Sequence, residues 1–95
     1  MSTQGQLTAT TTSQTLIASN TARLGILIKS MPTNTDLVYL NFVGGSATTS
    51  GIPLAAGESI FWSTEYGKIN AADWNAAVAV IGAAGGEDIR WVEFS

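Results

Sequence analysis

The 95-residue sequence contains no cysteine and no histidine. Disulfide bridges, cysteine nucleophiles, iron–sulfur clusters and ordinary zinc sites are therefore excluded, as is acid–base catalysis by histidine. Charged residues make up only 12% of the chain, against a usual share of about 25%. Its four basic residues and net charge of −3 match a phosphate backbone poorly, so no nucleic-acid partner is predicted.

Long apolar runs are missing as well. No stretch reaches the roughly 18 consecutive apolar residues of a membrane-spanning helix, so no membrane partner is predicted. The amino-terminal residues also lack the basic and apolar regions of a secretory signal. An absence of cysteine fits synthesis in a reducing cytosol. Because 45% of the residues are apolar, the chain can bury a core, and its length predicts a single domain over residues 1–95.

Period-two alternation of apolar residues predicts β-strands along most of the chain. The two clearest strands are Arg23–Ser30 and Leu37–Phe42. A short polar loop joins them, so they are predicted to pair as an antiparallel hairpin. One apolar row of each strand is predicted to be buried, and together these rows comprise Leu24, Ile26, Ile28, Val38, Leu40 and Phe42.

Other segments are also typical of strands or extended chain. They are Gln6–Thr12, Gln14–Ala18, Ile52–Glu58, Ser59–Thr64 and Glu87–Phe94. Residues 1–13 are expected to form an extended N-terminal arm or an edge strand. Gly57 stands where a type II turn requires a positive φ, so this glycine is predicted to be conformationally necessary.

The stretch Asn70–Ala84 permits two interpretations. Alanine favours helix, which would cover Ala71–Ile81. The β-branched residues and the following glycine pair favour a strand over Val78–Ala83, and this is the preferred interpretation. A short helical turn near residues 70–76 is compatible with it. The predicted fold class is all-β, as a small antiparallel β-sandwich or a jelly-roll-like barrel.

No motif for catalysis or for ligand binding is present. The seven acidic residues have no spacing that would place two of them across a cleft, and no calcium-binding loop pattern occurs. Neither glycine-rich segment has the lysine of a phosphate-binding loop. The chain is therefore predicted not to be an enzyme and to need no cofactor and no metal.

Aromatic residues point instead to an interface. Neighbouring residues in a strand face opposite sides, so Phe61 and Trp62 cannot both face one core, and the same holds for Trp91 and Val92. Strands that are apolar on both faces are buried on both faces, and for so small a chain another subunit can supply the second burial. The candidate contact residues are Phe61, Trp62, Trp74 and Trp91. A homo-oligomer is predicted, with a trimer favoured, or a monomer bound tightly to a partner protein. The alternative is a compact monomeric barrel with wrapped loops.

Three runs of sequence have a familiar pattern. They are "RLGILIKS", "LVYLNFVGGSATTSGIPLAAGESIFW" and "AVAVIGAAGGEDIRWVEF". Their shared features are Arg23 entering a strand, the strand from Val38 to Phe42, the turn from Gly51 to Glu58 and the closing strand from Ile89 to Phe94. In these features the chain resembles small virion proteins of tailed bacteriophages. The likeness covers most of residues 14–95, and the segment "STEYGKINAADWNAA" departs from it by being longer and containing tryptophan.

The resemblance implies a β-sandwich module that decorates phage heads or belongs to fibres and tail-tip assemblies. The expected function is that of a capsid decoration or cement protein in the virion, made in the host cytoplasm. Its expected partner is the major capsid protein or another virion protein. The alternative is a fibre or tail-tip module that binds a cell-surface glycan.

Overall fold

The computed structural model describes residues 2–63 and 75–95. Within these ranges the secondary structure consists of strands and no helix, which confirms the predicted all-β class. Accordingly, no described helix is long and apolar enough to cross a membrane. Most of the predicted helical turn near residues 70–76 lies outside the described residues. The strands are β1 (Thr3–Thr8), β2 (Gln14–Ile17), β3 (Gly25–Ser30), β4 (Val38–Asn41), β5 (Ile52–Leu54), β6 (Ser59–Ser63), β7 (Val78–Gly82) and β8 (Asp88–Phe94).

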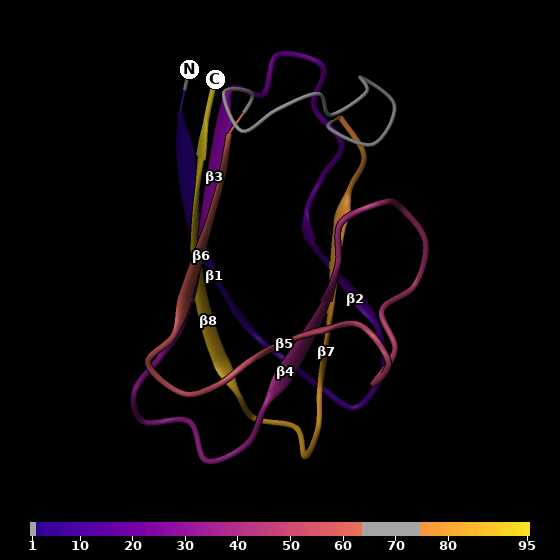
Figure 1. The fold of residues 1–95 in the computed structure, drawn as a ribbon, viewed down its shortest axis with the longest axis vertical. Coiled ribbons are helices and arrows are strands. Elements are labelled where there is room, and N and C mark those ends of the chain that lie inside the picture. The colour runs from indigo at the N-terminus through magenta and orange to yellow at the C-terminus, as the bar shows by residue number, and fades with distance from the viewer. Residues whose placement is uncertain (1, 64–74) are drawn as a thin grey trace.

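The strands form two antiparallel sheets that pack face to face (Figure 1). Sheet A has the strand order β1-β8-β3-β6, and sheet B has the order β2-β7-β4-β5. Between successive described strands, the chain changes sheet at every connection except the one from β4 to β5. This alternation is the connectivity of a jelly roll, so the predicted small β-sandwich is confirmed.

The valines of β7 explain why the alanine-rich region ends in a strand. β7 is a central strand of sheet B and pairs with β2 on one side and β4 on the other. Val78 and Val80 are completely buried there. Burial of these β-branched side chains in the core, together with backbone pairing on both sides of β7, outweighs the helical preference of the surrounding alanines.

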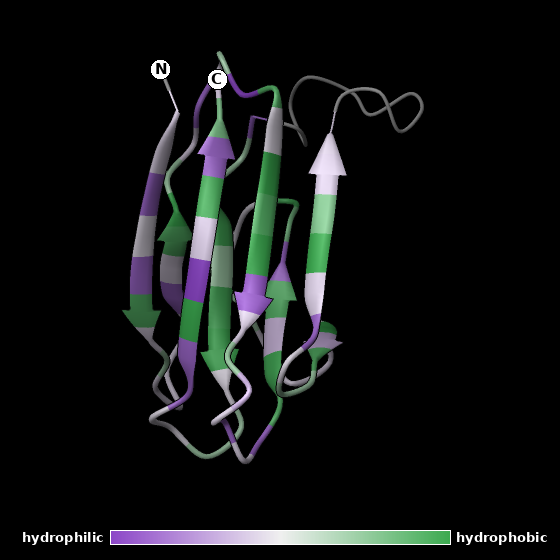
Figure 2. Ribbon diagram, turned by 90° about the vertical axis from the view of Figure 1, so that its left-hand side faces the viewer, coloured by the Kyte–Doolittle hydropathy of each residue, from purple (hydrophilic) through white to green (hydrophobic). Residues whose placement is uncertain are grey.

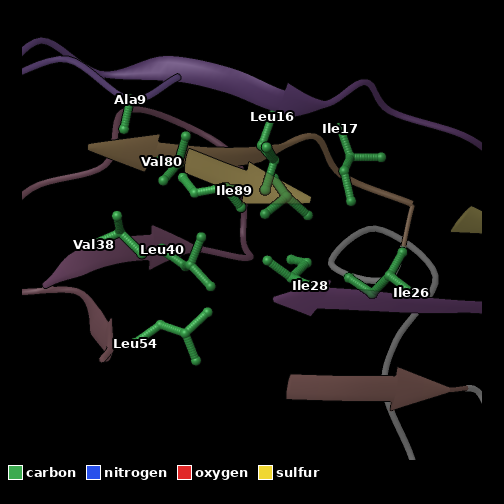
Figure 3. Close-up of a cluster of buried hydrophobic side chains, with 11 residues drawn as sticks. Ala9, Leu16, Ile17, Ile26, Ile28, Val38, Leu40, Leu54, Val80 and Ile89 are labelled. Atoms are coloured by element: carbon green, nitrogen blue, oxygen red, sulfur yellow. The ribbon is translucent and has the colours of Figure 1, made fainter. Parts of the chain in front are cut away.

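The core lies between the two sheets and is almost entirely aliphatic (Figure 3). Its side chains come from the inward rows of both sheets, and half-buried aromatic residues such as Phe42 and Trp62 close its margins. These two rings meet edge to face, with centroids 5.3 Å apart. The buried cluster consists of Ala9, Leu16, Ile17, Ile26, Ile28, Val38, Leu40, Leu54, Val78, Val80 and Ile89.

The predicted hairpin between the two clearest strands is wrong. β3 belongs to sheet A, where it pairs with β6 and β8, whereas β4 belongs to sheet B. The loop between them is fastened to β8 by Asn34. Its side-chain Nδ2 donates to the backbone oxygen of Asp88 at 2.9 Å, and its Oδ1 accepts from the backbone nitrogen of Asp88 at 2.8 Å. The chain therefore crosses beneath the sandwich to the other sheet and does not fold back on β3.

The predicted inward row of β3 is correct for Ile26 and Ile28 but wrong for Leu24. Leu24 is 59% exposed, because β3 begins only at Gly25. The interior position at this end of the sandwich is taken by the preceding residue, Arg23, whose side chain is fully buried. On the predicted pattern Arg23 would have faced outward. Phe42 is half-buried rather than fully enclosed.

Arg23 is buried together with Glu93 of β8. The Nε atom of Arg23 donates to Oε2 of Glu93 at 2.8 Å. Its two terminal nitrogens donate to the backbone oxygens of Ala76 and Ala18, each at 2.9 Å. Asn20 donates to the other carboxylate oxygen of Glu93 at 3.1 Å. One side chain thus connects the segment after β2, the segment before β7 and the end of β8.

We expect Leu40→Ala to lower the free energy of unfolding by about 2–5 kcal/mol, because Leu40 is 1% exposed and its removal leaves a cavity. Urea denaturation followed by tryptophan fluorescence measures the change. Leu24→Ala is the matched control and should cost less than about 0.5 kcal/mol, as an exposed surface change. Equal losses for the two variants would contradict the assignment of the core.

We expect Arg23→Met to cost about 3–5 kcal/mol, because it leaves the Glu93 carboxylate buried without its cation. The double variant Arg23→Met with Glu93→Leu removes both charges and should recover much of that loss. Thermal and urea unfolding of the three proteins measure the coupling. A double variant no more stable than Arg23→Met would show that burial of the lone carboxylate is not the source of the loss.

The turn before β6 confirms the predicted need for Gly57. Its φ is +80°, and the backbone nitrogen of Glu58 donates to the oxygen of Ala55 at 3.0 Å to close the turn. We expect Gly57→Val to destabilise the fold by about 1–3 kcal/mol through backbone strain. No atom would obstruct the new Cβ, so strain is the isolated cause. Gly57→Asn should cost less, since asparagine tolerates this conformation, and an equal cost in urea unfolding would contradict the explanation.

Candidate interaction surface

The outer face of sheet A is the surface on which exposed apolar residues line up across strands. Figure 2 views this sheet from outside. Strand register places its outward side chains in three parallel rows. The end row is Phe94, Gly25 and Ser63, of which Gly25 and Ser63 are buried. The central row is Gln4, Val92, Leu27 and Phe61, and the basic row is Gln6, Arg90, Lys29 and Ser59.

Two phenyl rings meet over the glycine of the end row. Phe61 on β6 and Phe94 on β8 lie on either side of β3, and their ring centroids are 6.3 Å apart in an edge-to-face arrangement. A Cβ atom on Gly25 would be 3.6 Å from Phe94 and 3.7 Å from Phe61. These are ordinary van der Waals distances, so the two rings flank Gly25 closely, as aromatic residues often cover a glycine in a sheet. Phe61 remains 44% exposed and Phe94 39%.

The basic row places two cations side by side. Lys29 and Arg90 are register partners on β3 and β8, and the Lys29 amine donates to the backbone oxygen of Gly57 at 3.0 Å. Arg90 binds Asp88 through two nitrogens, each 3.0 Å from a carboxylate oxygen. Gln6 also donates to Asp88 at 3.0 Å. Hydrogen bonds from Arg90 and Gln6 lower the pKa of Asp88, and the Asp88 carboxylate raises the pKa of Arg90.

A shallow groove of about 450 Å³ lies between these rows. Apolar side chains of the central row and polar side chains of the basic row both line it, and the backbone of β1 and β8 passes beneath. In the described part of the chain, Lys29 and Arg90 are the basic residues that solvent reaches, since Arg23 is buried. The face therefore combines an apolar strip with the accessible basic residues of the described ranges, one of which, Arg90, is paired with Asp88. Its lining residues are Gln4, Gly5, Gln6, Leu27, Lys29, Arg90, Trp91 and Val92.

The four candidate contact residues lie in different places. Phe61 points outward in the central row of sheet A. Trp62 and Trp91 are half-buried and pack against the core from the inner face of sheet A. Close packing of the Trp91 indole against β1 explains Gly5, where a Cβ would be only 2.6 Å from the indole ring. Trp74 lies outside the described residues.

Three outward-facing residues were not among those candidates: Leu27, Val92 and Phe94. The sequence contained a signal for two of them, because Leu27 follows the inward Ile26 and Val92 follows Trp91. Such apolar neighbours reveal that one of the pair faces outward, but not which one. Phe94 gave no signal of its own, since the strand ends there.

The described residues, 2–63 and 75–95, contain no group of three or more acidic side chains placed to hold a metal ion. The buried carboxylate of Glu87 is bound instead by the backbone nitrogens of Gly85 at 3.0 Å and Ala84 at 3.3 Å. Gly82 leaves the space that this carboxylate fills. Glu87 therefore stabilises the turn between β7 and β8.

No protein-family model matches the chain, and no curated protein matches it. A similar solved structure is that of Bacillus endospore appendages, described as a novel family of disulfide-linked pili. The likeness covers all of this chain and 85% of that one, with a TM-score of 0.60 and 19% sequence identity. At this identity the two chains share the fold.

Proposed function

We propose that this protein is a non-enzymatic structural subunit of a virion, most specifically a decoration or cement protein of a tailed-phage head. The observation that supports a structural role best is the outer face of sheet A. Four apolar residues from three strands adjoin there, and the two phenylalanines of the set keep large exposed fractions. An exposed apolar strip of this kind marks a contact surface.

A second surface suits assembly as well. β1 lies at one edge of sheet A and spans six residues without a proline or a charge. Proteins usually protect such edges with charges, prolines or bulges, because an open edge can accept a strand from another chain. The edge of sheet B at β5 is different, since β5 has three residues, one of them Pro53. Strand addition at β1 is thus a route by which a capsid protein could hold this subunit.

The structural neighbour supports the coarser part of the proposal, which is membership of an ordered assembly. Its subunits are described as linked by disulfides, whereas this sequence contains no cysteine. An assembly of this chain therefore does not depend on disulfides between its own residues. The assignment to a phage head depends on the sequence resemblance, and its partner there is the major capsid protein or another virion protein.

Phage particles that are assembled without this protein, after deletion of its gene from the phage genome, provide the test. Purified protein is added back, and the bound copies are counted by quantitative mass spectrometry after sedimentation. We expect hundreds of copies per particle for a decoration protein. Phe61→Ser should reduce binding, whereas Ile52→Ser should not, because Ile52 is similarly exposed at 53% but lies on β5 of the other sheet. No binding by the wild-type protein would contradict the proposal.

The fibre or tail-tip alternative has one observation in its favour. The groove on sheet A offers the carboxamides of Gln4 and Gln6 and the amine of Lys29 above an apolar floor, groups that can bind sugar hydroxyls. A few copies per particle, together with specific hits on a glycan array, would favour this alternative over head decoration.

A further inference from the structure

We infer that the outer face of sheet A binds the same face of a second copy, around a two-fold axis that runs along the central row. This inference rests on the proposed role of sheet A as an assembly surface and names its occupant. A two-fold interface requires a self-complementary patch, in which residue i meets residue j of the copy and j meets i. The three rows of sheet A meet this requirement.

The axis determines which rows face each other. When two sheets oppose each other around an axis along the central row, each central-row residue faces its own counterpart. The end row of one copy then faces the basic row of the other. Val92 and Leu27 bury their apolar side chains against the same residues of the copy. The strands of the two sheets run nearly along one another, which is the usual geometry of aligned sheet packing.

The basic row and the end row have complementary chemistry. On β8, Arg90 lies two positions below the central Val92, and Phe94 lies two positions above it. The proposed axis therefore brings each Arg90 guanidinium to the other copy's Phe94. A cation over an aromatic ring is attracted by its quadrupole, and exclusion of water strengthens the contact. Asp88 fixes the position of the Arg90 guanidinium on this face through its two hydrogen bonds.

The other in-plane axis is unfavourable. Consider a two-fold axis that is parallel to the strands and lies midway between β8 and β3. It would place each row opposite the same row of the copy, with β8 of one copy opposite β3 of the other. Arg90, paired with its own Asp88, would then face Lys29 of the copy, and neither arginine would lie against a phenyl ring. The contact between Arg90 and Phe94 therefore favours the axis along the central row.

The size of the face sets the strength of the contact. Four strands spaced about 4.8 Å apart and about 20 Å long present roughly 400 Å² of flat area per copy. A pair would bury about 800 Å² or somewhat more, which is below the roughly 1,200 Å² of stable interfaces and within the range of weak, transient contacts. We therefore expect a weak, reversible dimer that forms at high protein concentration.

The absence of cysteine makes a positional test direct, because each introduced cysteine is unique. Gln4→Cys and Gln6→Cys are matched variants, both exposed and both on β1. Gln4 lies on the proposed axis, so two copies of residue 4 face each other across a gap of about 10 Å between the sheets. Gln6 is about 7 Å further along the strand, so its two copies are roughly 17 Å apart.

The cross-linker is a bis-maleimide with a two-carbon spacer, because a direct disulfide would not span the gap. We expect Gln4→Cys to give several-fold more covalent dimer than Gln6→Cys at protein concentrations where sedimentation velocity shows the dimer. Equal yields from the two variants would overturn the proposed axis. Three outcomes would overturn the inference as a whole. The protein sediments as a trimer, it stays monomeric at all concentrations, or an oligosaccharide found with a glycan array occupies this face.

A second variant tests the interface without cross-linking. Leu27→Asp should raise the dissociation constant of the dimer at least about tenfold, since it places an unpaired charge in the contact. Ile52→Asp, on the other sheet, should leave the dimer unchanged, and circular dichroism checks that both proteins fold. An unchanged dimer with Leu27→Asp would overturn the inference. If the dimer fails these tests while the protein still binds particles, the two-fold contact is refuted and the structural function remains.

Discussion

The buried ion pair between Arg23 and Glu93 is the interaction on which the arrangement of sheet A depends. Arg23 occupies the interior at the end of the sandwich where β3 begins and β8 ends. The charge there must be matched, because an unpaired ion in an apolar interior is very costly. Glu93 supplies the opposite charge, and the backbone oxygens of Ala18 and Ala76 each accept a hydrogen bond from one of the two terminal nitrogens of Arg23.

This pairing has consequences along both strands. With Glu93 facing inward, alternation puts Ile89 and Trp91 inward too, and directs Val92 and Phe94 out. On β3, the register with β8 then places Ile26 and Ile28 in the core and Leu27 and Lys29 on the outer face. The inward orientation of Glu93, which satisfies the buried charges, therefore also fixes which residues of sheet A face outward.

The outer face differs chemically from the core on the opposite side of the same sheet. The core is filled by aliphatic side chains in a single dense cluster. The outer face instead combines apolar side chains with an arginine and a lysine whose polar groups reach solvent or a partner. Such a mixture is typical of surfaces that associate reversibly, which must be soluble alone and still gain energy when covered.

The sequence by itself determined the all-β class, most strand positions and the glycine-dependent turn before β6. These properties follow from local rules: period-two alternation, the stiffness of β-branched residues and the backbone freedom of Gly57. Only the tertiary structure decided which strands pair. A short polar loop such as the one after β3 fits a hairpin and a crossover equally well, and the contact of Asn34 with β8, more than fifty residues away, selects the crossover. The tertiary structure also decided which of two apolar neighbours faces outward, as with Phe61 and Trp62. Either orientation buries an apolar side chain, so the sequence alone does not distinguish them. The register of the strand with its distant partner strands sets the choice.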